Sequence, residues 1–196
     1  ISLGLVGSEM CIRDMYGTAK LPFHYNYVDG DLDVTHDNDD QGEHGSHVAG
    51  IATANRYIKT EDGFVSALEA VKVQGVAPDA QLITMKVFGK NGGAYDSDYM
   101  AAIEDAILLG CDVVNLSLGS SNPGNTDNET CQGFLEQLKE TDTVVAMAAG
   151  NAGTWADGAW NGHLYSDSVS LDMVGSPGSY TNSFTVASAD NVGYTC

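Results

Sequence analysis

The chain has 196 residues, enough for one ordinary domain with a sizeable core, and 43 % of them are hydrophobic. Its 27 acidic and 8 basic residues give a formal net charge of −19, which would repel nucleic-acid phosphates and anionic lipid headgroups, so neither is an expected partner. No stretch approaches the ~20 consecutive apolar residues that cross a bilayer. The apolar start, residues 1–6, lacks the length and the basic leader of a signal peptide.

Four cysteines, at positions 11, 111, 131 and 196, show no Cys-x-x-Cys pair and no clustering. Neither a zinc knuckle nor a disulfide framework is therefore indicated. Cys111 lies just before an apolar run and Cys131 lies in a helical pattern, so we expect both to be buried free thiols.

The first fifteen residues follow neither a helical nor a strand period. They resemble a translated sequencing-adaptor segment, so we interpret residues 1–15 as a non-native scar and leave them out of the fold prediction. The acidic, turn-rich segment 29–40 is most simply a solvated surface loop. Structural calcium is an alternative there because hard oxygen ligands cluster, although residues 37–40 lack the spacing of a known calcium loop.

Regular patterns follow the acidic segment. Residues 44–54 predict a helix with small and apolar residues on one side. A strand is predicted over residues 81–88, introduced by a turn at residues 77–79. Ser97 is the expected cap of a second helix, which has apolar residues at three-to-four-residue spacing and ends at Gly110.

The C-terminal half continues the alternation of strands and helices. Residues 113–118 form a nearly continuous apolar run, which predicts a strand covered on both faces. A helical pattern over residues 134–138 precedes strands over residues 143–149 and 184–189. This order predicts an α/β fold, a three-layer parallel sheet with helices on both faces. Ligands of such sheets bind beyond the carboxyl ends of the strands, so the polar segments that follow the strands are the candidate site.

The first candidate segment is residues 43–50, with the sequence EHGSHVAG. A general-base histidine needs a fixed ring and an open approach, and His44 in the first turn of an anchored helix would have both. Gly45 would remove a side chain that crowds this face, and Gly50 would let the helix lie close to a neighbour. A zinc site at His44 and His47 is the alternative, but histidines three residues apart do not match the common zinc helices.

Two other candidate segments each follow a predicted strand. Residues 115–119 (NLSLG) offer free backbone groups to an extended peptide, and Ser117 lacks the preceding glycine of a nucleophile elbow. In residues 148–153 (AAGNAG), Asn151 can aim its amide into a cleft where an oxyanion develops. A plain Asn-Gly loop is the alternative for that segment.

Together these segments resemble the subtilisin superfamily. Residues 44–50 match its histidine signature apart from serine in place of the usual threonine, and residues 75–80, 112–119 and 149–151 follow in the family's order and spacing. The chain is most similar to the lactocepin branch of Gram-positive cell-envelope proteinases, which includes streptococcal complement-cleaving peptidases. The segments that carry this finer likeness are residues 21–23, 26–27, 85–88, 102–105, 173–178 and 185–191.

The resemblance implies a role for each matching residue. His44 would take the proton of the nucleophilic serine and return it to the leaving amine, and Asn151 would donate to the oxyanion. The residues expected to form one rail for the substrate backbone are Ser117, Leu118 and Gly119. The residues expected to form the opposing rail are Gly92, Gly93 and Ala94. The expected walls of the primary specificity pocket are Ala148, Ala149 and Gly150, and their small size implies tolerance of large apolar side chains.

Two members of the family's catalytic triad have no match in this sequence. The family's aspartate lies in an Asp-Ser/Thr-Gly turn before the histidine and its serine follows Gly-Thr, but neither pattern occurs here, and Asp14 falls in the segment interpreted as a scar. We therefore expect residues 16–196 to be a partial peptidase domain, truncated at both ends and inactive alone. A non-catalytic binding module with the same fold is the alternative.

The same resemblance describes the expected parent protein. It would be a monomeric serine endopeptidase, secreted or attached to the cell wall of a Gram-positive bacterium. Its partners would be polypeptide substrates, and its chemistry would require no metal or other cofactor.

Overall fold

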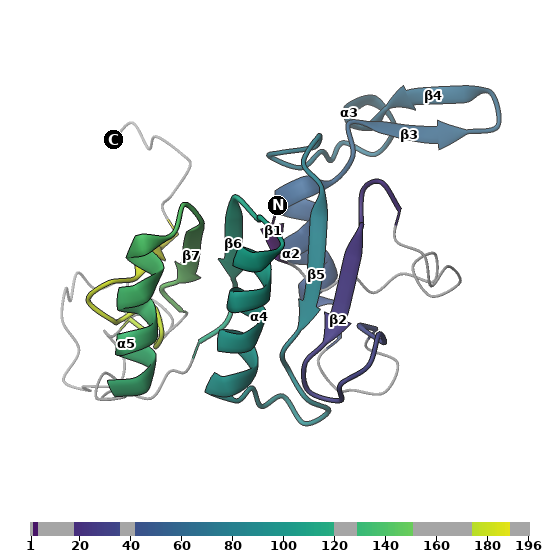
Figure 1. The fold of residues 1–196 in the computed structure, drawn as a ribbon. Helices are drawn as coiled ribbons and strands as arrows, with labels where there is room; N and C mark the ends of the chain where they lie inside the picture. Colours follow the sequence, from purple (N-terminus) through teal and green to yellow (C-terminus); the bar gives the residue numbers. More distant parts are fainter. Residues whose placement is uncertain (1, 4–17, 36–41, 120–128, 151–173, 189–196) are drawn as a thin grey trace, which may run out of the picture. The chain divides into compact units, whose positions relative to one another are not determined.

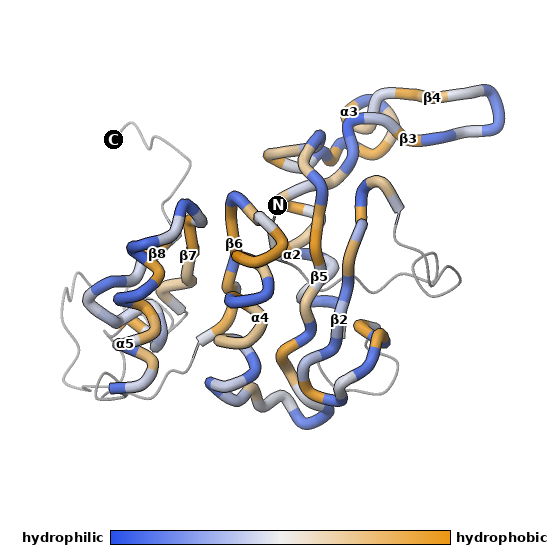
Figure 2. The backbone as a smooth tube through the Cα atoms, viewed as in Figure 1, coloured by the Kyte–Doolittle hydropathy of each residue, from blue (hydrophilic) through white to orange (hydrophobic). Residues whose placement is uncertain are grey.

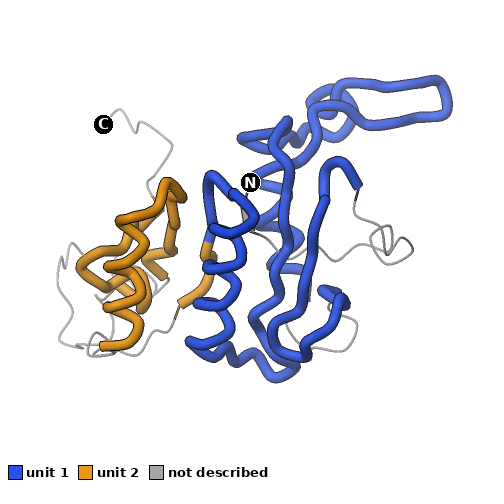
Figure 3. Tube along the Cα trace, viewed as in Figure 1, with its two compact units in different colours: residues 1–115 blue, residues 116–196 orange. Residues whose placement is uncertain are grey.

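The computed structural model of the chain describes residues 2–3, 18–35, 42–119, 129–150 and 174–188 (Figure 1). The chain divides into two compact units, residues 1–115 and residues 116–196 (Figure 3). None of the helices in the described ranges combines the length and the apolar character that a bilayer-spanning segment needs.

The first unit is organised around β5 (Leu82–Lys86), all five residues of which are buried. β5 pairs in parallel with β1 (Ser2–Leu3) on one side and with β2 (Phe23–Asn26) on the other. Figure 2 shows the apolar residues of this strand. Leu82, Ile83 and Met85 carry the apolar pattern that predicts this strand, and the polar Thr84 and Lys86 are buried with them. The predicted strand and the parallel α/β class are confirmed.

Two strands of this sheet do not follow from the sequence pattern. β2 mixes aromatic and polar residues over only four positions, too short a run to show a period of two. β1 lies within residues 1–15, where no periodicity is present. That these fifteen residues are non-native stays a prediction.

Two helices of the first unit, α2 (His44–Thr53) and α4 (Asp96–Leu108), confirm the helical patterns. In Figure 1, α2 passes behind β5 and α4 lies nearer the viewer. The buried residues of α4 recur at i, i+3, i+4 and i+7, so they share one face of the helix. They are Tyr99, Ala102, Ile103 and Ala106.

Gly110 ends α4 as predicted. Its φ of 76° lies in the left-handed region that glycine adopts without steric penalty. The Gly110 N–H donates to the carbonyl of Ile107 at 3.0 Å, and the Cys111 N–H donates to the carbonyl of Ala106 at 2.9 Å. This pair of bonds is the Schellman arrangement, which satisfies carbonyls that the helix leaves without partners.

The predicted cap at the other end of α4 is wrong. Tyr95 precedes the helix, and its side chain makes no capping hydrogen bond. Ser97 lies inside the first turn, where its hydroxyl contacts the Asp98 carboxylate at 3.2 Å. Two acidic residues in the first turn, Asp96 and Asp98, provide favourable charge at the positive end of the helix dipole instead.

The chain returns to the end of α2 after an excursion of about twenty residues. The N–H groups of Gly75, Val76 and Ala77 donate to the carbonyls of Ala54, Ile51 and Ala52 at 2.8–3.0 Å. A β-carbon at position 75 would lie 2.3 Å from the Ala54 nitrogen, so only glycine permits this approach. At Gly50, by contrast, a β-carbon would meet no atom of the described residues within 4 Å, so the expected close packing at Gly50 is wrong for this part of the chain.

The excursion itself consists of an antiparallel hairpin and a short helix. β3 (Tyr57–Thr60) pairs with β4 (Gly63–Ser66), and α3 (Ala67–Ala70) follows directly. The sequence pattern does not predict these elements, since both strands mix exposed apolar and polar residues.

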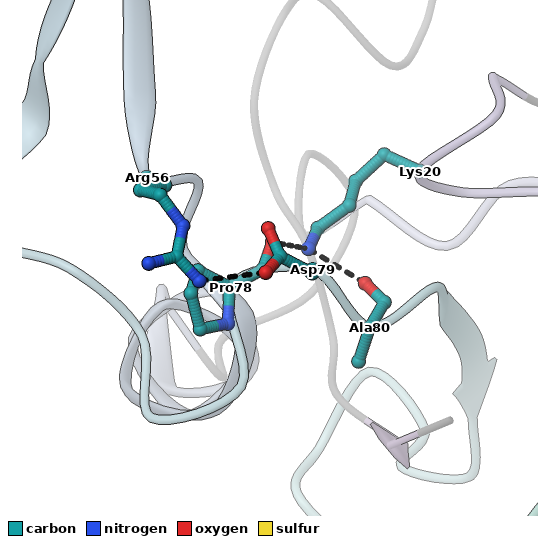
Figure 4. Close-up of polar contacts among 5 residues, drawn as sticks. All are labelled: Lys20, Arg56, Pro78, Asp79 and Ala80. Atoms are coloured by element: carbon teal, nitrogen blue, oxygen red, sulfur yellow. Dashed lines mark hydrogen bonds and ion pairs between the residues drawn. The ribbon is translucent and has the colours of Figure 1, made fainter.

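Polar contacts fix the turn that leads into β5 (Figure 4). The Lys20 ammonium donates to the carbonyls of Pro78 and Ala80 at 2.8 and 2.6 Å. Arg56 bonds the Asp79 carboxylate at 2.6 Å and lowers the pKa of that carboxyl. Because this ion pair is exposed, it contributes little to stability. The two bonds from Lys20 to backbone carbonyls instead fix the backbone of the turn. The predicted turn at residues 77–79 is confirmed by the Ala80 N–H, which donates to the Ala77 carbonyl at 3.1 Å.

The loop after β2 is tied to α4 by one side-chain bond. The Tyr27 hydroxyl donates to the Asp105 carboxylate at 2.6 Å. Burial, and then this bond, raise the pKa of the Tyr27 phenol well above its usual range. The neighbouring Tyr25 ring packs edge-on against Tyr27 with centroids 4.9 Å apart.

The second unit contains α5 (Glu129–Gln137), a 3₁₀ turn (Leu138–Glu140), β7 (Val144–Ala148) and β8 (Phe184–Val186). β8 runs parallel to β7, from the pair Ala146–Phe184 to the pair Ala148–Val186. These elements confirm the predicted helix and the two predicted strands.

β6 (Val113–Leu116) lies at the boundary of the two units and differs from its prediction. It is shorter than residues 113–118, and its burial alternates, with Val114 fully buried and Val113 39 % exposed. Because successive side chains of a strand point to opposite faces, this alternation indicates one covered face rather than two.

Both described cysteines are buried free thiols, as predicted. Cys111 is 4 % and Cys131 is 1 % exposed. Burial raises the pKa of the Cys111 thiol, so its reactive thiolate form is disfavoured.

The return of the chain onto α2 predicts different outcomes for two glycines. Gly75→Ala should lower the free energy of unfolding by about 1–3 kcal/mol, because the backbone must move to admit the β-carbon. Gly50→Ala is the matched control inside α2, where alanine should raise stability by about 0.5–1 kcal/mol. Urea unfolding measures both variants, and equal effects would contradict the close approach at position 75.

The bond from Tyr27 to Asp105 predicts a pH dependence. The pKa of the Tyr27 phenol is higher in the folded state than in the unfolded state, where it is about 10. The bond to Asp105 therefore stabilises the fold fully below pH 10, and this stabilisation is lost as the pH rises further. Tyr27→Phe should cost about 1 kcal/mol at pH 7 and should flatten the fall in stability above pH 10. Tyr25→Phe keeps the ring contact and is the control. An unchanged alkaline slope in Tyr27→Phe would refute the role of this bond.

Candidate active site

His44 is the first residue of α2, and its side chain is exposed. The helix behind it is anchored by three buried residues, Gly45, Ala49 and Thr53, and the Thr53 hydroxyl donates to the Ala49 carbonyl at 3.1 Å. An imidazole fixed at its base and open to solvent at its tip has the access that a general base requires. The exposure of His44 agrees with the expected open approach, and its role as a general base stays a prediction.

His47 lies three residues further along α2 and is also exposed. Within the described ranges, no group of three or more His, Cys, Asp or Glu side chains is placed to hold a metal ion. The zinc alternative at His44 and His47 gains no support from these residues.

The predicted pocket walls begin at Ala148, the last residue of β7, and continue over the two residues that follow it. The Ala149 N–H donates to the Val186 carbonyl of β8, and the Ala149 carbonyl accepts the N–H of Gly175, both at 2.9 Å. Gly150 has a φ of 94°, a conformation that residues with a side chain rarely adopt. The wall segment is thus held by backbone hydrogen bonds to β8 and to Gly175.

A third segment, residues 174–180, also contacts these walls, although from the sequence residues 173–178 carry only the family resemblance and no predicted role in the site. Here Ser176 and Pro177 are joined by a cis peptide bond, and the Ser179 N–H closes a turn onto the Gly175 carbonyl at 2.9 Å. A β-carbon at Gly178 would lie 2.6 Å from the Ala148 carbonyl oxygen, so the turn packs directly on the end of β7. The signal that could have found it is the pattern Gly-Ser-Pro-Gly, since paired glycines beside a proline mark tight turns and close backbone approach.

The same turn also meets the predicted substrate rail. Ser117 and Leu118 are half-buried and Gly119 is exposed, directly after β6. A β-carbon at Gly119 would lie 3.1 Å from the Ser176 carbonyl oxygen. Residues 117–119 and 148–150, predicted as separate parts of one site, therefore both contact the turn at residues 174–180.

The opposing rail, Gly92, Gly93 and Ala94, belongs to the first unit. It forms a tight turn after β5, in which the Gly89 N–H donates to the Gly93 carbonyl at 2.9 Å and Gly92 has a φ of 83°. Its position opposite residues 117–119 stays a prediction, as does the convergence of His44 with Asn151, because Asn151 lies outside the described residues.

The described part of the acidic segment, residues 29–35, is organised by hydrogen bonds within the protein. Asn26 is 2 % exposed, and its amide donates to the Asp29 carboxylate and to the Asp33 carbonyl, both at 3.0 Å. Lys86 is also buried and donates to the Thr35 carbonyl at 2.8 Å. Bonds from Thr35 lower the pKa of Asp33, so its carboxylate form is favoured. Calcium binding in this segment stays a prediction.

Comparison with known proteins places this arrangement in a family. The family model described as "Subtilase family" matches residues 6–195. The chain is 37 % identical over 182 residues to the PI-type proteinase of Lactococcus lactis subsp. cremoris, and equally to the PII-type proteinase of Lacticaseibacillus paracasei; each match covers 90 % of this chain and 9 % of the relative. It is 32 % identical over 176 residues to the C5a peptidase of Streptococcus pyogenes, covering 86 % of this chain and 14 % of that protein.

The chain spans about a tenth of the length of these relatives. The family match extends over nearly all of its residues and includes every segment predicted to carry the site. The predicted family and its lactocepin-like branch are confirmed. This chain therefore belongs to the subtilase family.

Proposed function

We propose that the protein containing this chain is a serine-type endopeptidase that hydrolyses peptide bonds through an acyl-enzyme. The observation that carries the proposal is the family match over residues 6–195 together with the exposed His44 at the start of an anchored helix. In a serine peptidase the histidine must reach both the nucleophile and the leaving group, and a buried imidazole could do neither.

The proposed mechanism gives His44 two proton transfers. It removes the proton from the serine hydroxyl as that oxygen attacks the substrate carbonyl, and then gives this proton to the amine that leaves. The carboxamide of Asn151 donates a hydrogen bond to the oxyanion of the tetrahedral intermediate, where charge develops only during the reaction. Water then attacks the carbonyl of the acyl-enzyme: His44 takes the proton of the water and gives it to the serine oxygen as the ester bond breaks and the acid product leaves.

Substrate binding is assigned to backbone groups and small side chains. Residues 117–119 on one side and residues 92–94 on the other would pair with an extended polypeptide, and residues 148–150 would form the walls of the primary specificity pocket. Support comes from the second unit, where residues 117–119 and 148–150 both contact the turn at residues 174–180. Small walls leave room for large apolar substrate side chains.

This chain alone is proposed to be inactive, because its sequence contains neither the family's aspartate turn nor its Gly-Thr-Ser segment. The chemistry needs no metal, although structural calcium is compatible with the acidic segment. The similarity to proteinases of Gram-positive bacteria supports a secreted or cell-wall-attached parent that acts on polypeptides as a monomer. A parent that lacks the serine would instead be a binding module with the same fold.

The proposal predicts covalent labelling of the full-length protein by a serine-directed phosphonate. His44→Ala should abolish labelling and lower turnover by about 10⁶-fold, the magnitude known for subtilisin itself and carried over by family membership. His47→Ala, an exposed position on the same helix, is the matched control and should leave labelling intact. Loss of activity in both variants, with stoichiometric zinc in the purified protein, would favour the metal alternative.

The oxyanion role predicts a smaller and different effect at position 151. Asn151→Ala should reduce kcat by about 10²–10³-fold with little change in KM, again the value for subtilisin. Steady-state kinetics with a chromogenic peptide would measure the split. A large rise in KM with an unchanged kcat would show that Asn151 binds the ground state and would contradict the assignment.

A further inference from the structure

Asn26, the last residue of β2, is a buried polar residue to which the proposed mechanism gives no role; it is 2 % exposed. A buried carboxamide is costly unless its donors and acceptors are paired. Its Nδ2 donates to the Asp29 carboxylate and the Asp33 carbonyl, both at 3.0 Å. Its Oδ1 accepts the N–H groups of Val28 and Asp29 at 3.1 and 3.2 Å. Because all of these bonds run to residues 28–33, this one side chain fixes the loop that follows β2.

The same loop is attached to the end of β5. Asn26 lies opposite Lys86 in the parallel pair of strands, and the N–H of Tyr27 donates to the Lys86 carbonyl at 2.9 Å. Further along the loop, the Lys86 ammonium donates to the Thr35 carbonyl at 2.8 Å. The loop over residues 27–35 is therefore bonded to β5 at both of its ends.

Val28 connects this loop to the turn that carries the proposed substrate rail over residues 92–94. A β-carbon at Gly89 would lie 3.3 Å from the Cγ1 atom of Val28, so the Val28 side chain packs directly against Gly89. Gly89 closes the turn, since its N–H donates to the Gly93 carbonyl at 2.9 Å and its carbonyl accepts the N–H of Gly92 at 3.0 Å. The carboxamide that bonds the backbone of Val28 is thus one side-chain contact away from the rail.

The rail depends on such contacts because it is built mainly of glycine. Gly92 and Gly93 are exposed, and Gly92 has a φ of 83°. Glycine has more backbone freedom than any other residue, so a glycine turn is ordered by what it packs against. A rail that had to be ordered when the substrate binds would bind it less tightly, because the lost conformational entropy would reduce the binding free energy.

We propose that Asn26 is a positioning residue for the substrate rail over residues 92–94. By fixing Val28, its carboxamide holds the turn at Gly89 where the rail can pair with an extended polypeptide. This inference rests on the proposed endopeptidase function and extends its account of substrate binding. It assigns Asn26 to the binding of substrate residues distant from the cleaved bond and not to the chemical step.

Two substrates of the full-length protein distinguish this role from a purely structural one. The first carries a single residue before the cleaved bond and is too short to lie along the rail, whereas the second carries an extended peptide there. Asn26→Ala should lower kcat/KM for the extended substrate by about 2- to 12-fold, the effect of one neutral hydrogen bond to the rail, through a rise in KM. It should leave kcat/KM for the short substrate unchanged.

Val28→Ala removes the contact with Gly89 but leaves the buried hydrogen bonds of Asn26 in place. Val28 is only half-buried, so this variant should fold even where Asn26→Ala does not. It should cause the same selective loss with the extended substrate.

Lys20→Met is the matched control, because it removes two hydrogen bonds to backbone carbonyls before the start of β5, at the strand end away from the rail. It should lower the thermal midpoint, as Asn26→Ala also should. The ratio of the kcat/KM values for the two substrates should stay at the wild-type value.

An equal change with both substrates in Asn26→Ala and Val28→Ala, or no change with either substrate, would overturn the inference and leave Asn26 a structural role alone. Wild-type protein that cleaves neither substrate and takes no phosphonate label would instead overturn the proposed function itself. Phosphonate labelling of the wild-type protein separates these two failures.

Discussion

Parallel pairing of buried strands is the constraint on which the site depends. β5 in the first unit and β7 in the second each have a parallel neighbour, so within each sheet the segments that leave the paired strands emerge at one edge of that sheet. In the second unit this places residues 148–150 next to the turn that also contacts residues 117–119. The candidate substrate-binding residues are not in the middle of the strands but at or after their ends. The buried strands therefore determine where these polar segments start.

Close backbone approach is the second requirement, and small residues provide it. The wall segment, the rail and the turn at residues 174–180 meet through backbone atoms, and positions 119 and 178 have no room for a β-carbon without a shift of their neighbours. A surface built in this way leaves backbone groups available to an extended polypeptide, as the proposed function requires.

The sequence predicts the elements whose signals are local and strong. β5 consists mostly of apolar residues, and α4 repeats apolar residues and ends at a glycine with a left-handed conformation. The β3–β4 hairpin escapes prediction because its apolar residues are exposed, so they follow no pattern set by burial. Ser97 is wrongly predicted as the cap because serine is a common residue at the position before a helix. In the structure Ser97 lies inside the first turn, and the charges of Asp96 and Asp98 stabilise that end of the helix instead.

In the candidate site, too, some residues could be predicted from the sequence and others could not. His44 and residues 148–150 belong to continuous motifs, and their segments could be found by matching residue types and spacing. The packing of Val28 on Gly89 has no such signature, because the two residues lie far apart in sequence. A contact of this kind can only be assessed once the fold is known.

His44 and Asn151 lie more than a hundred positions apart in the chain, and the proposed mechanism requires both to act on one substrate. A crystal structure of the full-length protein with a phosphonate bound to its serine would test this requirement. We expect the His44 imidazole within hydrogen-bond distance of the serine oxygen, and the Asn151 amide bonded to the phosphonyl oxygen. A structure in which these two side chains face different surfaces would contradict it.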